Sequence, residues 1–156
     1  MGHCVTGLIA KAGIIEPFAR ERSLHAPRPL YADLYILPLR DSDLDSFLKP
    51  PLAGYPEGFT YLAASLMQEL LAASVEGTLM YFETEYFGGS GSQGAVVCQA
   101  GEIAFGPKAA ELGPINEALA LFGIRASTSE ADAFQTVGLG RHRRTSDWLG
   151  LGDDDA

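Results

Sequence analysis

The sequence predicts an α+β fold in two layers: an antiparallel sheet of about five strands, with two to three helices on one face of it. Three strand-like segments follow one another between residues 78 and 106 with only short turns between them, which is typical of an antiparallel meander. Two other segments repeat apolar residues at helical spacing. The chain has 156 residues, of which 47% are hydrophobic, so it is long and apolar enough to bury one core.

The remaining elements follow from the same patterns and from the turn residues between them. In chain order we expect a strand over 3–10, a helix over 13–24, a strand over 30–39, a short helical turn over 43–48, a loop over 49–58, a helix over 60–76, strands over 78–87, 93–99 and 102–106, and a last helix from Pro114. Pro17 must then lie in the first turn of its helix, where its missing N–H costs nothing. Asp41 and Ser42 are placed to cap the short helical turn.

The segment over 60–76 has the clearest helical pattern. Its apolar residues recur at helical spacing and are predicted to face the core; they are Phe59, Leu62, Ala63, Leu66, Met67, Leu70 and Leu71. Thr60 is a suitable N-cap residue, and Gly77 is a suitable residue to end the helix. We therefore expect this helix to cover one face of the sheet.

The last part of the chain has weaker patterns. The helix that begins at Pro114 should end at Gly123, and residues 130–137 are also expected to be helical. Residues 150–156 include three consecutive aspartates and are expected to form a disordered acidic tail. We therefore assign residues 1–149 to a single α+β domain.

Charge and cysteine content restrict the kind of partner. The chain has 20 acidic and 11 basic residues, and its net charge of −9 repels nucleic acids and anionic lipids, so a basic partner fits better. No apolar run reaches the length of about 18 residues that a membrane span needs. Cys4 and Cys98 lie far apart in apolar segments without zinc spacing, so we expect buried, reduced thiols in a cytoplasmic protein. We predict no cofactor and no metal site.

A glycine-rich segment joins the first two strands of the meander. Gly89-Ser90-Gly91-Ser92-Gln93-Gly94 matches G-x-G-x-x-G, but a dinucleotide site needs a helix after the glycines, and a strand is predicted here. Protein kinases place this motif between strands, yet the chain has no lysine between Lys49 and Lys108 and is too short for a kinase. The segment is therefore either a structural turn or a polar binding loop.

Glu83 and Glu85 lie two residues apart in the predicted strand over 78–87, so their side chains point to the same face. Tyr81 and Phe87 share this face. The opposite face is the better core face; it carries Met80, Phe82, Thr84 and Tyr86. Two carboxylates at this spacing, roughly 7 Å, can hold a metal ion or act as acid and base. The alternative is a solvated outer face.

A second cluster of charge lies near the end of the chain, where three of the 11 basic residues fall within Arg141-His142-Arg143-Arg144. Guanidinium groups in such a cluster can bind a phosphate or carboxylate. The alternative is that these arginines pair with acidic groups of the same protein. His142 is a candidate general base, but no serine or cysteine nucleophile can be assigned to it.

These two segments also carry a resemblance. The stretch over 81–93, with Tyr86-Phe87-Gly88-Gly89-Ser90-Gly91-Ser92-Gln93, and the stretch Gly138-Leu139-Gly140-Arg141-His142-Arg143 resemble small uncharacterised bacterial proteins. Those proteins share a Tyr-Phe-Gly-Gly-x-Gly-x-Gln loop and a Gly-Leu-Gly-Arg-His-Arg end. The resemblance covers about a third of the chain. It implies a bacterial, cytosolic origin and no particular activity.

Two functions remain open at this point. The first is non-enzymatic binding, either of a basic protein, in the manner of an immunity-type inhibitor of a toxin, or of a second copy as a homodimer; the sequence contains no complete catalytic set. The second is a small-molecule or anion site, with or without catalysis, in which the glycine-rich loop joins Glu83 and Glu85 to Arg141 and His142. The candidate site residues are Glu83, Glu85, Tyr86, Phe87, Gly89, Gly91, Gln93, Arg141 and His142.

Overall fold

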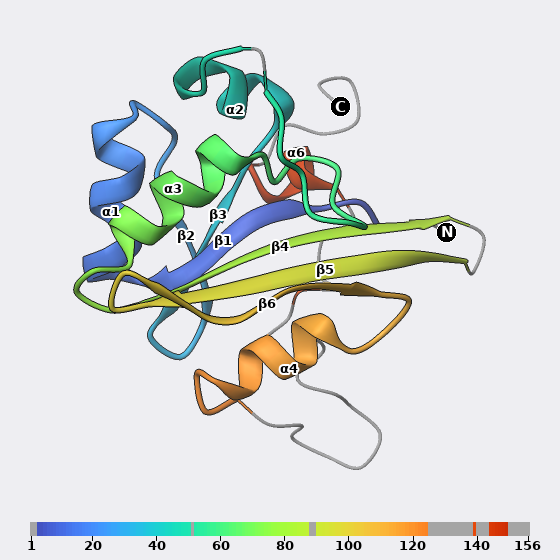
Figure 1. The fold of residues 1–156 in the computed structure, drawn as a ribbon. Coiled ribbons are helices and arrows are strands. Elements are labelled where there is room, and N and C mark those ends of the chain that lie inside the picture. Colours follow the sequence, from blue (N-terminus) through green and yellow to red (C-terminus); the bar gives the residue numbers. More distant parts are fainter. Residues whose placement is uncertain (1–2, 51, 88–89, 125–138, 140–143, 150–156) are drawn as a thin grey trace.

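The computed structural model describes residues 3–50, 52–87, 90–124, 139 and 144–149. Its centre is one antiparallel sheet (Figure 1). The strands are β1 (Thr6–Lys11), β2 (Arg28–Tyr31), β3 (Leu34–Pro38), β4 (Thr78–Phe87), β5 (Ser90–Gln99) and β6 (Glu102–Ala110), and their order across the sheet is β2-β3-β1-β4-β5-β6. The predicted α+β class with an antiparallel sheet is confirmed, with six strands in place of about five.

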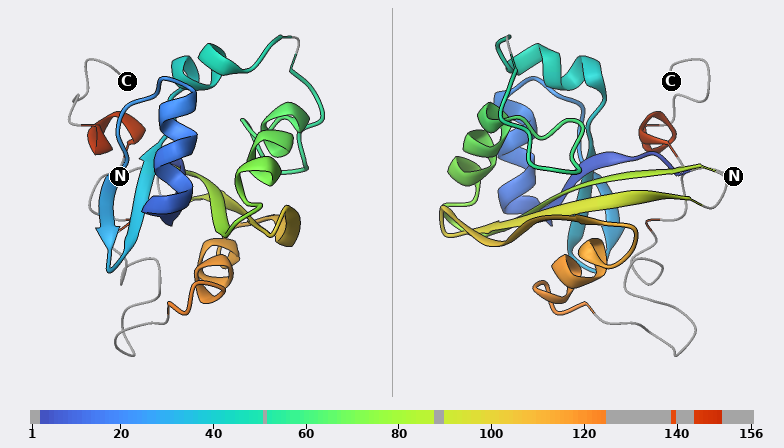
Figure 2. Two further views of the ribbon diagram at one scale, coloured as in Figure 1. Left: turned by 90° about the vertical axis from the view of Figure 1, so that its left-hand side faces the viewer. Right: turned by 45° about the vertical axis from the view of Figure 1, so that its right-hand side comes forward.

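Helices cover both faces of this sheet (Figure 2). Helices α1 (Ala12–Glu21), α2 (Asp41–Phe47) and α3 (Ala64–Ala73) lie on one side, and α4 (Pro114–Ala120) lies on the other. A short helix near the end of the described chain, α6 (Thr145–Trp148), lies beside β3. We expected helices on one face alone, and α4 is the difference: its Ile115, Ala118 and Leu119 are fully buried against the second face.

The sheet therefore separates two clusters of buried side chains. The cluster beneath α1 and α3 includes Ile15, Phe18, Leu66, Leu70, Tyr81 and Val96. The cluster on the α4 side includes Ile9, Met80, Phe82, Val97, Ile115 and Trp148. Residues 79–84 of β4 are consequently buried on both faces, and this double burial sets the environment of the predicted site residues.

Several element boundaries differ from expectation. The expected strand over 30–39 is a pair, β2 and β3, because a turn at Ala32 and Asp33 with a positive φ of 51° at Ala32 reverses the chain. Pro17 is the sixth residue of α1, not part of its first turn. A proline inside a helix costs about 3 kcal/mol. The burial of Ile15 and Phe18 against the sheet offsets this cost and keeps the helix continuous.

Helix α3 begins at Ala64, with Ala63 in place of Thr60 at the N-cap, and it ends at Ala73. The meander is longer than predicted, because β5 begins at Ser90 and β6 continues to Ala110. The expected helix over 130–137 and the expected tail over 150–156 lie outside the described residues. Within the described ranges, no helix is long and apolar enough to cross a membrane.

Candidate functional site

The strand pair β4–β5 carries most of the predicted site residues. Its pairing runs from Thr78 with Gln99 to Phe87 with Ser90, whereas the pairing of β6 with β5 reaches only Gln93. The end of this hairpin therefore projects past the edge of β6 (Figure 1). Glycine is required at Gly91, where φ is 150° and a Cβ atom would lie 2.0 Å from the Glu85 carbonyl oxygen. Gly89, the other predicted loop glycine, lies outside the described residues.

Glu83 is buried, with only 7% of its surface exposed. Its Oε1 accepts the backbone N–H of Thr60 at 2.8 Å, and its Oε2 accepts the N–H of Tyr61 at 2.8 Å and the hydroxyl of Tyr81 at 2.5 Å. Both carboxylate oxygens are thus engaged within the protein. Since a buried carboxylate is tolerated only when it is hydrogen-bonded, these three donors explain why Glu83 lies inside and not on a solvated face.

The segment over 58–63, which crosses this face before α3, is what buries Glu83. The ring of Phe59 lies directly on Gly94, the cross-strand partner of Glu83, where a Cβ atom would approach the ring to 2.7 Å. The same ring packs against Tyr81, with centroids 6.4 Å apart. Glu83 and Gly94 therefore form the binding site for this segment: the glycine leaves room for the ring of Phe59, and the carboxylate accepts hydrogen bonds from the backbone of the two residues that follow Phe59.

Tyr81, on the same strand as Glu83, contacts both the carboxylate of Glu83 and the ring of Phe59. Its side chain is fully buried. Burial, followed by the charge and the hydrogen bond of Glu83, raises the pKa of the Tyr81 hydroxyl well above its usual range. Tyr81 therefore stays a neutral donor to the Glu83 carboxylate, which suits a structural contact.

Two residues further along β4, Glu85 is exposed, because the covering segment does not extend over it. Around it lies a surface that we name the tip surface, made of Asp41, Tyr61, Glu85 and Phe87. Burial raises the pKa of the Tyr61 hydroxyl, and the charges of Asp41 and Glu85 raise it further. The carboxylates of Asp41 in α2 and Glu85 in β4 therefore both act electrostatically on this one tyrosine. Phe87 is 61% exposed.

Cys4 borders the tip surface. It is exposed, in contrast to the buried thiol that we expected, because β1 begins only at Thr6, while Cys98 is buried as predicted. Partial desolvation and then the charge of Glu85 raise the pKa of the Cys4 thiol, and Arg144 opposes them. An isolated parallel bridge joins Cys4 to Arg144. The end of the basic cluster is thus near Glu85, while Arg141 and His142 lie outside the described residues.

The opposite face of the hairpin holds α4. Gln93 accepts the backbone N–H of Ile115 through Oε1 at 2.7 Å and donates through Nε2 to the Tyr86 hydroxyl at 3.0 Å. The Tyr86 hydroxyl in turn donates to the carbonyl of Glu111. Gln93 and Tyr86, both predicted as binding residues, thus fasten the start of α4 to the sheet.

The space left among these residues is small. The cavity bordered by Thr60, Glu83, Glu85 and Gln93 has a volume of about 10 Å³. That is the size of a single water molecule. Within the described residues, no group of three or more histidine, cysteine, aspartate or glutamate side chains is arranged to hold a metal ion.

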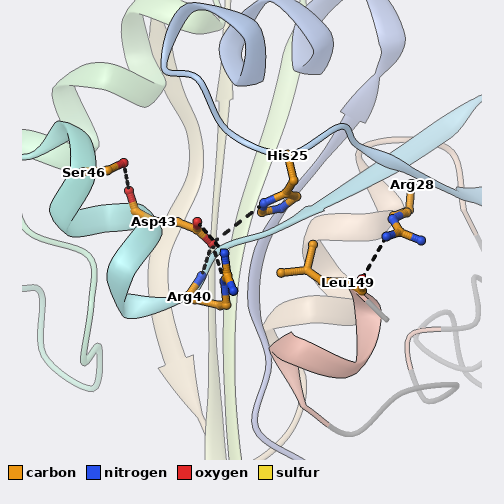
Figure 3. Close-up of polar contacts among 6 residues, drawn as sticks. All are labelled: His25, Arg28, Arg40, Asp43, Ser46 and Leu149. Atoms are coloured by element: carbon orange, nitrogen blue, oxygen red, sulfur yellow. Dashed lines mark hydrogen bonds and ion pairs between the residues drawn. The ribbon is translucent and has the colours of Figure 1, made fainter. Parts of the chain in front are cut away.

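A second charged cluster, which the sequence did not reveal, surrounds Asp43 (Figure 3). Asp43 is 7% exposed. Its carboxylate accepts the backbone N–H of Arg40 at 2.9 Å and hydrogen bonds from Nε and Nη2 of the same residue at 3.2 Å each, and it lies 4.0 Å from Nδ1 of His25. Arg28 donates to the Leu149 carbonyl at 3.0 Å. The cluster joins the start of α2 to the loop before β2 and to the chain after α6.

Burial lowers the pKa of His25, and the nearby Asp43 carboxylate opposes this effect. The contact with Asp43 depends on how α2 folds back over the loop, and no spacing in the sequence indicates it.

Comparisons of this chain with protein-family models, with curated proteins and with solved structures found no match. The resemblance noted in the sequence therefore stays a prediction. What the protein does has to be inferred from the arrangement of its own residues.

Proposed function

We propose that this protein is a non-enzymatic binding protein that engages a basic partner protein through the tip surface, in the manner of an immunity-type inhibitor. The observation that carries this proposal is that some side chains of one hairpin are bonded within the protein while others are exposed. The polar side chains of Glu83, Tyr86 and Gln93 in this hairpin are bonded within the protein. At its projecting end, Glu85 and Phe87 are exposed.

The chemistry of the tip surface suits a protein partner. A large exposed aromatic ring beside carboxylates is the kind of anchor that interfaces bury at their centre. Phe87 provides the ring, and Glu85 and Asp41 provide negative charge on a chain whose net charge is −9. Negative charge beside an apolar anchor speeds association with a basic partner, and added salt slows it.

The size of the space around Glu83 supports binding over catalysis at this place. A drug-sized ligand needs a pocket of roughly 300 Å³ or more. The cavity of about 10 Å³ beside Glu83 is far smaller. In addition, a carboxylate that already accepts three hydrogen bonds has little capacity to take a proton from a substrate.

One observation favours the second candidate function, an anion site. Arg144 lies near enough to Cys4 for its charge to lower the pKa of that thiol, whereas the charge of Glu85 raises it. An anion site that uses Arg141 and His142 would then border the tip surface. A phosphate or carboxylate titration that shifts the resonance of His142 would favour this candidate.

The main proposal is tested by native mass spectrometry on complexes purified from the organism that encodes the protein. The tip variant combines Glu85→Lys with Phe87→Ser. The control variant combines Glu102→Lys with Ile103→Ser, an exposed acidic and apolar pair at the start of β6, opposite the end of β5 that is remote from the tip surface. We expect a stoichiometric basic protein with the wild type and the control, and its loss with the tip variant.

Salt provides a second measure of the same complex. Its association rate should fall as ionic strength rises, because exposed charges are screened over about 10 Å at 0.1 M salt. A complex that the tip variant retains, or the absence of any stoichiometric protein partner, contradicts the proposal.

A further inference from the structure

We propose a second, separate binding site at the opposite end of the sheet from the tip surface, for a small zwitterion with an apolar body, of the size of an aromatic amino acid or a dipeptide. The site is a cavity of about 640 Å³. This volume lies within the range of roughly 300–1,000 Å³ that is typical of small-molecule sites.

Four segments that are distant in the sequence form this cavity. They are the end of β1, the first turn of α1, the turn that leads into β4, and the end of α4. The cavity lies at the start of β4, whereas Phe87 of the tip surface is the last residue of the same strand (Figure 1). Because helices from both faces of the sheet contribute, the cavity lies where the two cores meet past the ends of the strands.

The apolar wall consists of Ile14, Leu121 and Phe122. Ile14 packs against the core beneath α1, and Phe122 packs against the core beneath α4, so the core holds both side chains in place. Leu121 is 51% exposed. A ligand with an apolar body would remove this leucine surface from water, which is the main source of affinity in such a site.

Two residues of opposite charge, Lys11 and Glu76, line the same cavity. Lys11 pairs with Asp33 at 3.4 Å, but both side chains are more than two-thirds exposed, so this ion pair is weak and can be exchanged for a ligand carboxylate. No ion pair joins Glu76 to another described residue. Lys11 and Glu76 thus suit a carboxylate and an ammonium, respectively.

The backbone favours the same orientation. The first turn of α1 has no acidic residue, and Gly13, which lines the cavity, has open space where a side chain would begin. A carboxylate beside Lys11 would therefore also benefit from the positive end of this helix. The ligand's ammonium would lie beside Glu76, and its apolar body against Leu121.

This pair of charges discriminates between ligand classes. A fatty acid would satisfy Lys11 but would be repelled by Glu76, and an apolar amine would meet the reverse situation. A zwitterion satisfies both.

The test is a titration of the ¹⁵N-labelled protein, followed by amide chemical shifts, with L-phenylalanine and the dipeptide Leu-Phe as probes. Three analogues each lack one feature: 3-phenylpropanoate lacks the ammonium, 2-phenylethylamine lacks the carboxylate, and glycine lacks the apolar body. We expect L-phenylalanine or Leu-Phe to shift the amides of residues 11–14, 76–78 and 121–122. Each analogue should bind at least about tenfold more weakly, because it loses either one charge-assisted contact or, for glycine, the burial of apolar surface.

Substitutions identify the residues. Lys11→Gln and Glu76→Gln should each weaken binding of the zwitterion about tenfold, and Lys11→Gln should leave the weak binding of 2-phenylethylamine no weaker. Lys108→Gln and Glu117→Gln are matched controls, because this exposed pair, 2.8 Å apart, has the same chemistry outside the cavity. Affinity that neither cavity variant changes, or the absence of shifts at these amides with either zwitterion at millimolar concentration, overturns the proposal.

The outcome is independent of the proposed protein-binding function. The tip variant with Glu85→Lys and Phe87→Ser should bind the zwitterion as the wild type does. Failure at the cavity with an intact protein complex, or the reverse, therefore shows which of the two proposals is wrong.

Discussion

Glu83 and Glu85 are the same residue type, two positions apart on one strand and on the same face, yet they have opposite roles. Glu83 is 7% exposed and accepts three hydrogen bonds from residues 60, 61 and 81. Glu85 is exposed. The difference lies in what the segment around Phe59 binds: its ring packs on Gly94, the cross-strand partner of Glu83, and the next two backbone N–H groups donate to the Glu83 carboxylate.

This comparison teaches that a strand's own pattern does not decide whether a carboxylate is structural or available to a partner. For Glu83, the role depends on Thr60 and Tyr61, which lie more than 20 residues away in the chain. The following substitutions test it, beginning with the largest expected effect.

Glu83→Ala should destabilise the protein the most, by about 3 kcal/mol, because it leaves two backbone N–H groups and the Tyr81 hydroxyl without their acceptor. Urea unfolding measures this loss. Glu85→Ala is the matched control and should change stability by less than about 0.5 kcal/mol. Equal effects of the two substitutions would remove the distinction between the two glutamates.

Gly94→Ala should cost about 2 kcal/mol, because the new Cβ atom would lie 2.7 Å from the buried ring of Phe59. The same substitution at Gly13 meets nothing within 4 Å and lies inside α1, so it should stabilise by up to about 1 kcal/mol. Both values come from chemical denaturation. A neutral Gly94→Ala would mean that the ring does not need the space above the glycine.

Gln93→Leu should cost about 1.5 kcal/mol, because the buried N–H of Ile115 loses its acceptor on the α4 side of the hairpin. Hydrogen exchange gives a local readout: the Ile115 amide should exchange faster, while the amides of Thr60 and Tyr61 on the other face should keep their protection. Faster exchange on both faces would show that the two sides of the hairpin are not independent.

At the other buried carboxylate, Asp43, we expect a smaller effect on the free energy of unfolding, and this effect depends on pH through the neighbouring His25. Since burial lowers the pKa of the neighbouring His25 in the fold, the unfolded chain takes up a proton first as pH falls. This contribution to stability is present at neutral pH and is lost as pH falls below about 6.5, the ordinary value.

Unfolding free energies measured between pH 7.5 and pH 5 test this for the wild type and for His25→Gln. In the variant, the free energy of unfolding should depend less on pH. The other charged groups around position 25, Arg28, Arg40 and Asp43, are the same in both proteins. An identical slope in both proteins would show that His25 does not contribute.

Phe87→Ser should have the smallest effect on stability, within about 0.5 kcal/mol, because the ring is 61% exposed. Thermal unfolding of the isolated protein measures it. A large loss would place Phe87 among the structural residues together with Glu83, and would contradict its role as an anchor for a partner.

The sequence predicted the α+β class, and the bounds of β4 agree with expectation. It did not predict that both faces of β4 are buried. Leu79, Met80, Tyr81 and Phe82 form a continuous apolar run, which is typical of a strand covered on both sides, but the following Glu83 and Glu85 favoured a solvated face. The turn that divides β2 from β3 contains neither glycine nor proline and so gave no signal.

The candidate site was predictable only in part. The sequence placed Glu83 and Gln93 in the same pair of strands, but it gave no indication of their partners, which include the backbone N–H groups of Thr60 and Ile115. Every residue except proline has such a group, so no residue type marks it in a sequence. The cavity beside Lys11 was missed for a related reason, since its four walls meet only after the sheet has formed.

The position of β1 affects the order in which the chain can assemble during synthesis. This strand lies between β3, which follows it closely, and β4, whose Glu83 pairs with Thr6 across more than 70 residues of chain. On the ribosome, β1 has one neighbour early and gains the second only after more than 70 further residues have been made. Apolar residues of β1 such as Leu8 and Ile9 therefore stay partly uncovered until then, and this is the period in which a nascent chain depends on chaperones.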